Sequence, residues 1–435
     1  MKTVTLLFFL LSTAGLAAQT APVAVEKQED GWRLMIGDEP LMVNGMNWDY
    51  FPIGTNYEYN LWDKPDDFIK KALDDEMELL QDIGINAIRV YTGIQPKWIS
   101  YIHENFGIYT MLNHSFGRYG LMLDGNWEGN TDYADHRVIK LLMNEVEALA
   151  KDFKDTPGLL LYLLGNENNY GLFWGGAVTE DIPNVDDRYK SRARDMYKLF
   201  NQAALAMKTI DPDHPVSICN GDLLFMDILT EECPDVDIFG INVYRGASFN
   251  DLFERVQNEY GKPILHTELG ADAFNDSLQL EDPCAQAWYL RENWCEIYQN
   301  AAGLGSSNVI GGFTFQSSDG WWKYSQTTNL DVHDTHASWS NGGYLHDYMD
   351  GRNNMNEEWF GISAKGQTDA NGHYPLFPRA AYYVLKEVHS FDPYAEGNSS
   401  EKIRQYFDSI SIRKAFIKAG GEEDAACSIG KTRLE

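Results

Sequence analysis

Eight short apolar runs recur along the chain, and segments with helical spacing separate most of them. The run 158–164 (GLLLYLL) is apolar throughout, so a strand formed there must be covered on both faces, as in a buried parallel sheet. The segment 66–83 instead repeats its apolar residues with helical spacing, and Gly84 follows as a C-terminal cap. The predicted strands are 41–47, 86–91, 107–115, 158–168, 215–222, 236–246, 262–270 and 308–316.

This alternation predicts an α/β fold, a (β/α)8 TIM barrel with a short N-terminal β-hairpin around the turn signal GDEP (37–40). A doubly wound open sheet is the rival fold. It would usually carry a glycine-rich phosphate-binding turn after an early strand, and the sequence has none. The predicted helices are 66–83, 138–153, 189–210, 249–260, 283–302 and, closing the barrel, 378–391.

The two ends of the chain carry separate predictions. Residues 1–20 read as a secretory signal peptide, because a lysine precedes a short apolar stretch and then small residues. Residues 22–395 are expected to form the barrel domain, and 396–435 either a polar tail or the start of a further module. We therefore expect an exported protein, periplasmic or extracellular, without membrane insertion, since no later stretch is apolar enough to span a bilayer.

Composition mainly excludes partners. The formal net charge is −30, which argues against binding to nucleic acid or to an anionic membrane surface. Aromatic residues make up 13% of the chain, which fits either a large core or a cleft lined with flat rings. The five cysteines include no C-x-x-C motif; Cys219–Cys233 and Cys284–Cys295 are possible disulfides, and buried thiols are the alternative. The oligomeric state stays open.

Polar side chains stand where the apolar strands end. In a barrel the C-terminal ends of the strands surround one pocket, so Glu167 and Glu268, from the fourth and seventh strands, should face each other there. Two such carboxyl groups are what glycoside hydrolysis requires, and a separation of roughly 5–5.5 Å would indicate a retaining mechanism. The other candidates at strand ends are Asn47, Trp48, Arg89, Asn113, His114, Asn166, Asn242, Tyr244, Asp319, Trp321 and Trp322.

Three motifs carry a family resemblance: GNEN (165–168), NVY (242–244) and HTELG (266–270). Together they resemble the retaining glycoside hydrolases of clan A, with the barrel domain of family 2 nearest in pattern and family 5 also similar. The segment 357–387 resembles the end of such barrels, and the resemblance covers roughly 31–388.

The resemblance implies a role for each matched residue. Glu167 would be the general acid/base and Glu268 the nucleophile, and no cofactor or metal is implied. The remaining implied roles are hydrogen bonds to the nucleophile from Arg89 and Tyr244, binding of the sugar 2-hydroxyl by Asn166, a platform under the reacting sugar from Trp321 or Trp322, and a pocket wall from His114.

We thus predict a secreted retaining β-glycosidase that hydrolyses a β-linked glucan or mannan by double displacement. One alternative is a β-glucan transglycosylase with the same catalytic pair, and another is a non-catalytic carbohydrate-binding barrel. A third is a metal-dependent barrel enzyme that uses the acidic and histidine side chains of 331–336 (DVHDTH).

Overall fold

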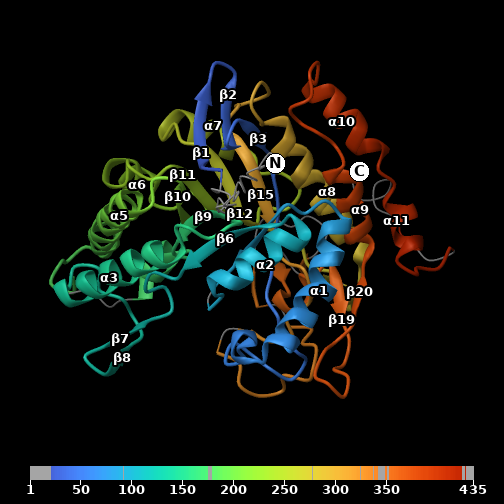
Figure 1. Cartoon of the computed structure of the whole chain (residues 1–435), viewed down its shortest axis with the longest axis horizontal. Coiled ribbons are helices and arrows are strands. Elements are labelled where there is room, and N and C mark those ends of the chain that lie inside the picture. The colour runs from blue at the N-terminus through green and yellow to red at the C-terminus, as the bar shows by residue number, and fades with distance from the viewer. Residues whose placement is uncertain are drawn as a thin grey trace, which may run out of the picture.

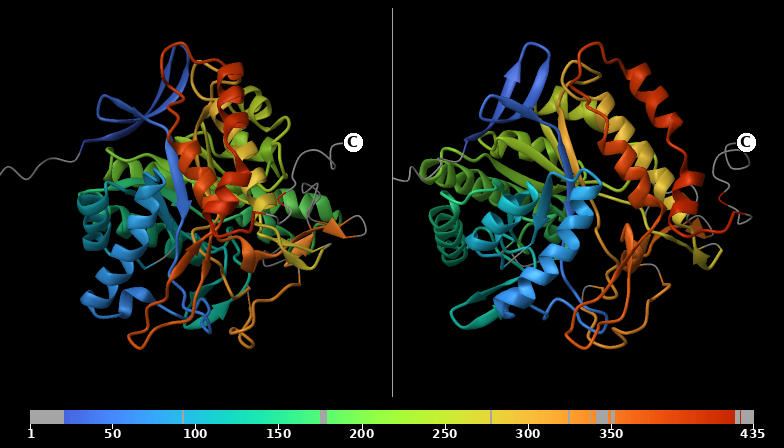
Figure 2. Two further views of the ribbon diagram at one scale, coloured as in Figure 1. Left: turned by 90° about the vertical axis from the view of Figure 1, so that its right-hand side faces the viewer. Right: turned by 45° about the vertical axis from the view of Figure 1, so that its right-hand side comes forward.

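The computed structural model describes residues 21–91, 93–174, 179–276, 278–323, 325–336, 338–340, 348–349, 352–423 and 427. Eight parallel strands close into a barrel at the centre of the molecule (Figures 1 and 2). The predicted (β/α)8 barrel is confirmed, and every barrel strand lies within the range expected for it. In order around the barrel the strands are β4 (Val43–Asn47), β5 (Ala87–Val90), β6 (Tyr109–His114), β9 (Leu159–Leu164), β10 (Val216–Gly221), β11 (Ile238–Asn242), β12 (Ile264–Leu269) and β15 (Val309–Thr314).

A helix follows each barrel strand and packs outside the ring. The prediction missed α2 and α6, and α5 begins four residues before its predicted start, where the Asn184 side chain accepts a hydrogen bond from the backbone N–H of Asp187. The helices are α1 (Asp66–Asp82), α2 (Pro96–Phe106), α3 (His136–Phe153), α5 (Val185–Ile210), α6 (Met226–Glu232), α7 (Leu252–Glu259), α8 (Pro283–Gln299) and α9 (Ala380–His389).

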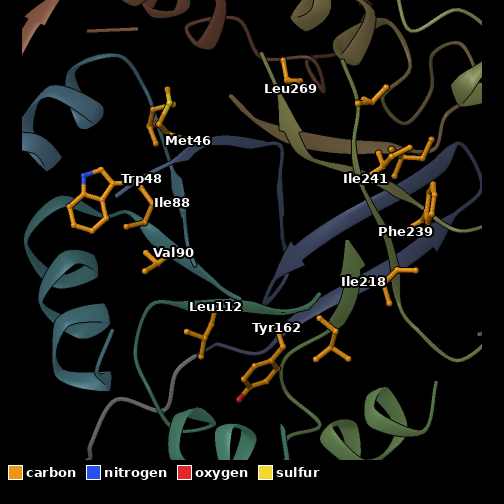
Figure 3. Packing of buried hydrophobic residues seen from close by; sticks show 14 of the residues in the cluster. Met46, Trp48, Ile88, Val90, Leu112, Tyr162, Ile218, Phe239, Ile241 and Leu269 are labelled. Atoms are coloured by element: carbon orange, nitrogen blue, oxygen red, sulfur yellow. The ribbon is translucent and has the colours of Figure 1, made fainter. Parts of the chain in front are cut away.

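The strands separate two apolar layers. Side chains that point inward, such as Met111, Leu163 and Phe313, fill the barrel, and the Phe313 ring lies so close to Gly45 that a Cβ there would meet it at 2.4 Å. Side chains that point outward, such as Leu112 and Tyr162, pack under the helices (Figure 3). Because neighbouring residues of a strand face opposite sides, each strand end offers one residue to the barrel interior and the next to the outer layer.

The N-terminal segment covers the end of the barrel opposite the candidate site. It forms a three-stranded antiparallel sheet from β1 (Val23–Gln28), β2 (Gly31–Ile36) and β3 (Glu39–Leu41), one strand more than the predicted hairpin. The backbone N–H of Val23 donates to the carbonyl of Asp213, just before β10. Leu34 is fully buried in the inner layer. This sheet therefore closes the barrel where its strands begin.

The segment 396–435, expected to be either a polar tail or the start of a further module, is folded where the structure describes it. It forms α10 (Ser400–Ser409) and α11 (Ile412–Lys418), and α10 packs along α8 (Figure 2). Ile403 and Phe407, four residues apart, are fully buried in the outer core layer. Cys284 pairs with Cys427, so the suggested Cys284–Cys295 disulfide does not form. The suggested Cys219–Cys233 disulfide does not form either, because Cys219, Cys233 and Cys295 are buried free thiols.

Shorter elements belong to the loops. No described helix is long and apolar enough to cross a membrane. The signal-peptide prediction falls on residues 1–20, outside the described part of the chain. The short elements are η1 (Leu61–Asp63), β7 (Leu121–Leu123), β8 (Asn126–Glu128), α4 (Asn168–Gly171), η2 (Leu172–Trp174), β13 (Phe274–Asn275), β14 (Leu280–Glu281), β16 (Trp339–Ser340), β17 (Tyr348–Met349), β18 (Arg352–Met355), η3 (Glu357–Trp359), β19 (Ser363–Lys365) and β20 (Leu376–Pro378).

Candidate active site

Glu268, near the end of β12, is held by three donors and is 7% exposed. Its Oε1 accepts hydrogen bonds from Arg89 Nη1 at 2.8 Å and from the Tyr91 hydroxyl at 2.7 Å. Its Oε2 accepts one from the Tyr244 hydroxyl at 2.8 Å. Donors on both oxygens fix the orientation of the carboxylate. The contacts predicted from Arg89 and Tyr244 to Glu268 are therefore present, and Tyr91 adds a third.

Arg89, on β5, is fully buried and connects the two ends of the site. Its Nη2 donates to Asn113 Oδ1 at 2.7 Å and to Asn166 Oδ1 at 2.9 Å, while Nη1 bonds Glu268. Burial alone would lower the pKa of Arg89, but the facing Tyr91, Cys219 and Glu268 hold it above its ordinary value. The guanidinium is thus a fixed positive charge between β9 and β12.

Glu167 lies three residues after the end of β9, at the same end of the barrel as Glu268. Its backbone is left-handed, with φ of 56°, which is uncommon for a residue with a side chain. Burial, followed by the negative charge of Glu268, raises the pKa of Glu167 to about 7. One carboxyl group is therefore poised to carry a proton near neutral pH beside another whose oxygens accept from three donors, and acid-assisted displacement requires such a difference between the two groups.

Asn166 is anchored on both sides of its amide. The Oδ1 atom accepts from Arg89 Nη2 and from Asn242 Nδ2 at 3.0 Å, and Nδ2 donates to the Tyr119 hydroxyl at 2.6 Å. Its backbone N–H donates to Asn168 Oδ1 at 2.8 Å. The GNEN motif is therefore held rigidly, which positions Glu167 as well as Asn166.

The first strand contributes support. Asn47 is buried, and its Oδ1 lies 3.1 Å from the Tyr91 hydroxyl oxygen, whose single proton it shares with Glu268 Oε1. Its Nδ2 donates to the backbone carbonyls of Thr267 and Phe313 at 3.2 and 3.3 Å. Asn47 therefore acts on the site through Tyr91 and the strand backbones.

Two predicted substrate contacts lie on the outer face of the barrel. Trp48 packs in the outer core layer (Figure 3), and its Nε1 donates to Glu76 Oε2 on α1 at 2.7 Å. His114 Nε2 lies 3.3 Å from Glu145 Oε2 on α3. Each follows an inward-facing asparagine, so strand alternation turns both side chains toward the helices. The structure assigns Trp48 and His114 to the barrel–helix interface, which corrects their predicted role.

Trp321 and Trp322 lie in the loop after β15, and both are partly buried. The Trp321 ring stacks on His333 with centroids 4.4 Å apart, and His333 stacks in turn on Trp359 at 3.6 Å. Trp322 instead makes an edge contact with Phe51 at 5.4 Å. Trp322 is thus free of the histidine stack, and the platform role stays a prediction for either tryptophan.

Within 331–336, the side chains of His333, Asp334 and His336 are engaged with protein groups. His333 Nε2 is hydrogen-bonded to the carbonyl of Glu358 at 2.9 Å in addition to its stacking. Asp334 accepts from Lys323 Nζ at 2.8 Å and bonds His336 Nδ1 at 2.8 Å. Among the described residues, no group of His, Cys, Asp and Glu is arranged to hold a metal ion.

The structure adds residues to the site predicted from the sequence. Tyr91 lies two positions after Arg89, and that spacing could have identified it as a site residue from the sequence. Glu357, in η3, is a third carboxyl group at the site, and its pKa is raised to about 8 by burial and by Glu268 and Glu167. No local pattern marks Glu357, because a long loop returns it from after β15. Asn113 and Asn242 were recognised only as polar strand ends, although both bind the Arg89–Asn166 network.

A closed eight-stranded barrel with a glutamate pair at the C-terminal ends of β9 and β12 has the architecture of a glycoside hydrolase. Comparison with family models agrees: residues 67–302 match the model described as "Glycosyl hydrolases family 2, TIM barrel domain". The chain belongs to this family, which confirms the resemblance to clan A and selects family 2 from the two candidates. Comparison with curated proteins gives no match.

Solved structures with the same fold include named glycosidases at low identity. A family 2 β-galacturonidase from Eisenbergiella tayi is 16% identical with a TM-score of 0.52, and the match covers 86% of this chain and 55% of that one. A β-glucuronidase from Bacteroides uniformis is 11% identical with a TM-score of 0.55, over 84% and 37% of the two chains. One from Ruminococcus gnavus is 13% identical with a TM-score of 0.53, over 85% and 53%. The chain thus spans about half or less of the length of these structures.

Proposed function

We propose that the protein is an exported retaining β-glycosidase in which Glu268 is the nucleophile and Glu167 the acid/base. The observation that carries this proposal is the unequal environment of the two carboxyl groups. Both oxygens of Glu268 accept hydrogen bonds from a set of three donors, whereas burial and the charge of Glu268 raise the pKa of Glu167 to about 7. Export rests on the sequence of residues 1–20 alone.

The reaction proceeds in two displacements. Glu268 attacks the anomeric carbon while Glu167 gives its proton to the departing glycosidic oxygen, which leaves a glycosyl ester on Glu268. Burial still raises the pKa of Glu167 in that ester, but the contribution of the Glu268 charge is gone, so the pKa falls and Glu167 can act as a base. It then takes a proton from water, which attacks the same carbon and releases the sugar with its original configuration.

The substrate we propose is a neutral β-linked glucan or mannan, as oligosaccharide or polysaccharide. Glu357 supports this choice, because it places a third carboxyl group beside Glu167 and Glu268, and a sugar carboxylate would add another negative charge there. A neutral sugar can instead accept a hydrogen bond from protonated Glu357.

A β-glycuronide is the second candidate, favoured by the names of the structural neighbours, which are β-galacturonidases and β-glucuronidases. Such a substrate needs a cation for its carboxylate. Besides Arg89, which already pairs with Glu268, Arg118 is a cation whose charge acts on Glu167, and Lys323 is one whose charge acts on Glu357. The attraction of the sugar carboxylate to either cation would have to exceed its repulsion by the carboxyl groups of the site.

The test is a panel of p-nitrophenyl β-glycosides, comprising glucoside, mannoside, galactoside, glucuronide and galacturonide. Proton NMR of the first product formed reports its anomeric configuration. We expect turnover of a neutral sugar, a β product, and loss of turnover in Glu268→Gln. Turnover of glucuronide or galacturonide alone would select the second candidate, and an inverted product would refute the mechanism. Longer products at high acceptor concentration would identify a transglycosylase.

A further inference from the structure

A hairpin after β6 carries an exposed apolar surface that the catalytic pair leaves unused. It consists of β7 and β8 and projects from the edge of the molecule (Figure 1). Leu121 and Leu123 are buried on one of its faces. Met122 and Trp127, paired across the hairpin on its other face, are 55% and 61% exposed. Single exposed apolar side chains are common on protein surfaces, so the position of this pair relative to the active site is what indicates a binding role.

The base of the hairpin is bonded to the catalytic motif. Tyr119, at the start of the hairpin, accepts a hydrogen bond from Asn166 Nδ2 at 2.6 Å and is 40% exposed. The preceding Arg118 donates through Nε to the backbone carbonyl of Asn166 at 2.9 Å. The exposed surface therefore starts beside the residue that precedes Glu167.

The Trp127 ring is seated next to Tyr119. Gly120 has a φ of +91°, and a Cβ there would lie 2.6 Å from Cζ2 of Trp127 and 2.7 Å from the carbonyl of Glu128. The indole thus rests on the Gly120 backbone at a place where a side chain would displace it. Gly120 directly follows Tyr119, and consecutive Cα atoms are about 3.8 Å apart, so the indole lies one residue along the hairpin from the tyrosine that bonds Asn166.

We propose that Trp127, with Met122 beside it, forms a sugar-binding subsite on the leaving-group side, occupied by a pyranose ring of a β-linked oligosaccharide. The inference rests on the proposed function, since Glu167 protonates the leaving group and the surface extends from the Glu167 side of the site. A pyranose offers an apolar C–H face that packs on an exposed indole, while its hydroxyl groups stay in water. Charge plays no part in this contact, which suits a neutral glycan.

The kinetic test compares a tetrasaccharide with an aryl glycoside of the same sugar. The substrates are the β-1,4-linked tetrasaccharides of glucose and mannose and the matching p-nitrophenyl glycosides. We expect Trp127→Ala to lower the ratio of kcat/KM for tetrasaccharide to kcat/KM for aryl glycoside by about tenfold. Trp127→Phe should recover most of that ratio. Phe377→Ala is the matched control, because Phe377 is 56% exposed in β20; equal ratios for Trp127→Ala and Phe377→Ala would overturn the subsite.

A binding measurement separates the subsite from the reaction. Calorimetric titration of the same tetrasaccharides into Glu268→Gln should give a Kd that rises about tenfold when Trp127→Ala is added. Binding through Trp127 without turnover of any glycoside would support the subsite and refute the proposed hydrolysis. The opposite outcome is that aryl glycosides are turned over, but tetrasaccharide binding is absent or unaffected by Trp127→Ala. This outcome would refute the subsite and leave the proposed hydrolysis intact.

Discussion

Replacing Glu167 by glutamine should stabilise the protein at alkaline pH while it abolishes general acid catalysis. Burial and the Glu268 charge raise the pKa of Glu167 from 4.5 to about 7. Below about pH 4.5 the carboxyl group is protonated in both the folded and the unfolded chain, so its burial carries no ionisation cost. Between pH 4.5 and 7 only the unfolded chain loses the proton, and the stability of the wild type falls as the pH rises.

The size of the effect follows from the two pKa values. Their difference of about 2.5 corresponds to about 3 kcal/mol at roughly 1.36 kcal/mol per pH unit, and this cost is complete above about pH 7. Glutamine has nearly the shape of the protonated carboxyl group and never ionises. The stability of Glu167→Gln relative to wild type should therefore rise by about 3 kcal/mol between pH 4 and pH 8.5.

Urea unfolding followed by tryptophan fluorescence at several pH values measures this difference. Glu254→Gln, at an exposed position of α7, is the control and should differ from wild type by the same small amount at every pH. A stability difference for Glu167→Gln that did not change with pH would refute the argument. It would mean that the carboxyl group titrates at its ordinary pKa and is not prepared to act as an acid.

Three further predictions concern other parts of the molecule. Tyr91→Phe and Tyr244→Phe each remove one donor to Glu268, so steady-state assays should show kcat/KM falling about tenfold to a hundredfold; unchanged kinetics would contradict the proposed anchoring. Trp48→Phe leaves Glu76 without its indole donor, so the free energy of unfolding in urea should fall by about 1–3 kcal/mol while KM stays unchanged. A raised KM would instead identify Trp48 as a substrate contact. Cys284→Ser removes a disulfide that spans a sequence separation of 143 and should lower the free energy of unfolding by about 2–5 kcal/mol. A reducing agent should lower the Tm of the wild type but not that of the variant. Equal changes in Tm would argue against the disulfide.

The barrel could be predicted because its strands are buried on both faces. A parallel strand covered by helices outside and by side chains inside must be apolar along its length, and eight such runs left few alternatives. The glutamate pair was predictable for the same reason, since a carboxyl group at the end of an apolar run stands out. The polar composition of 396–435 concealed α10, although Ile403 and Phe407 carry its four-residue spacing.

The errors at the site follow from strand alternation and from long-range contacts. Trp48 follows Asn47 and His114 follows Asn113; once the asparagines face the barrel interior, the next residues must face the helices. Strand alternation can be read from the sequence alone, so the outward direction of Trp48 and His114 was predictable. Glu357 and the Cys284–Cys427 pair are different, because each joins segments whose meeting depends on the whole fold.

The central claim is that Glu268 forms a covalent bond to the sugar, and trapping that bond tests it most directly. A 2-deoxy-2-fluoro-β-glycosyl fluoride of the sugar selected by the glycoside panel slows the second displacement, so the glycosyl ester accumulates. Peptide mass mapping of the inactivated protein should place one sugar on Glu268, and Glu268→Gln should take up none. A label on Glu167 or Glu357, or inactivation with no covalent sugar on any glutamate, would contradict the account.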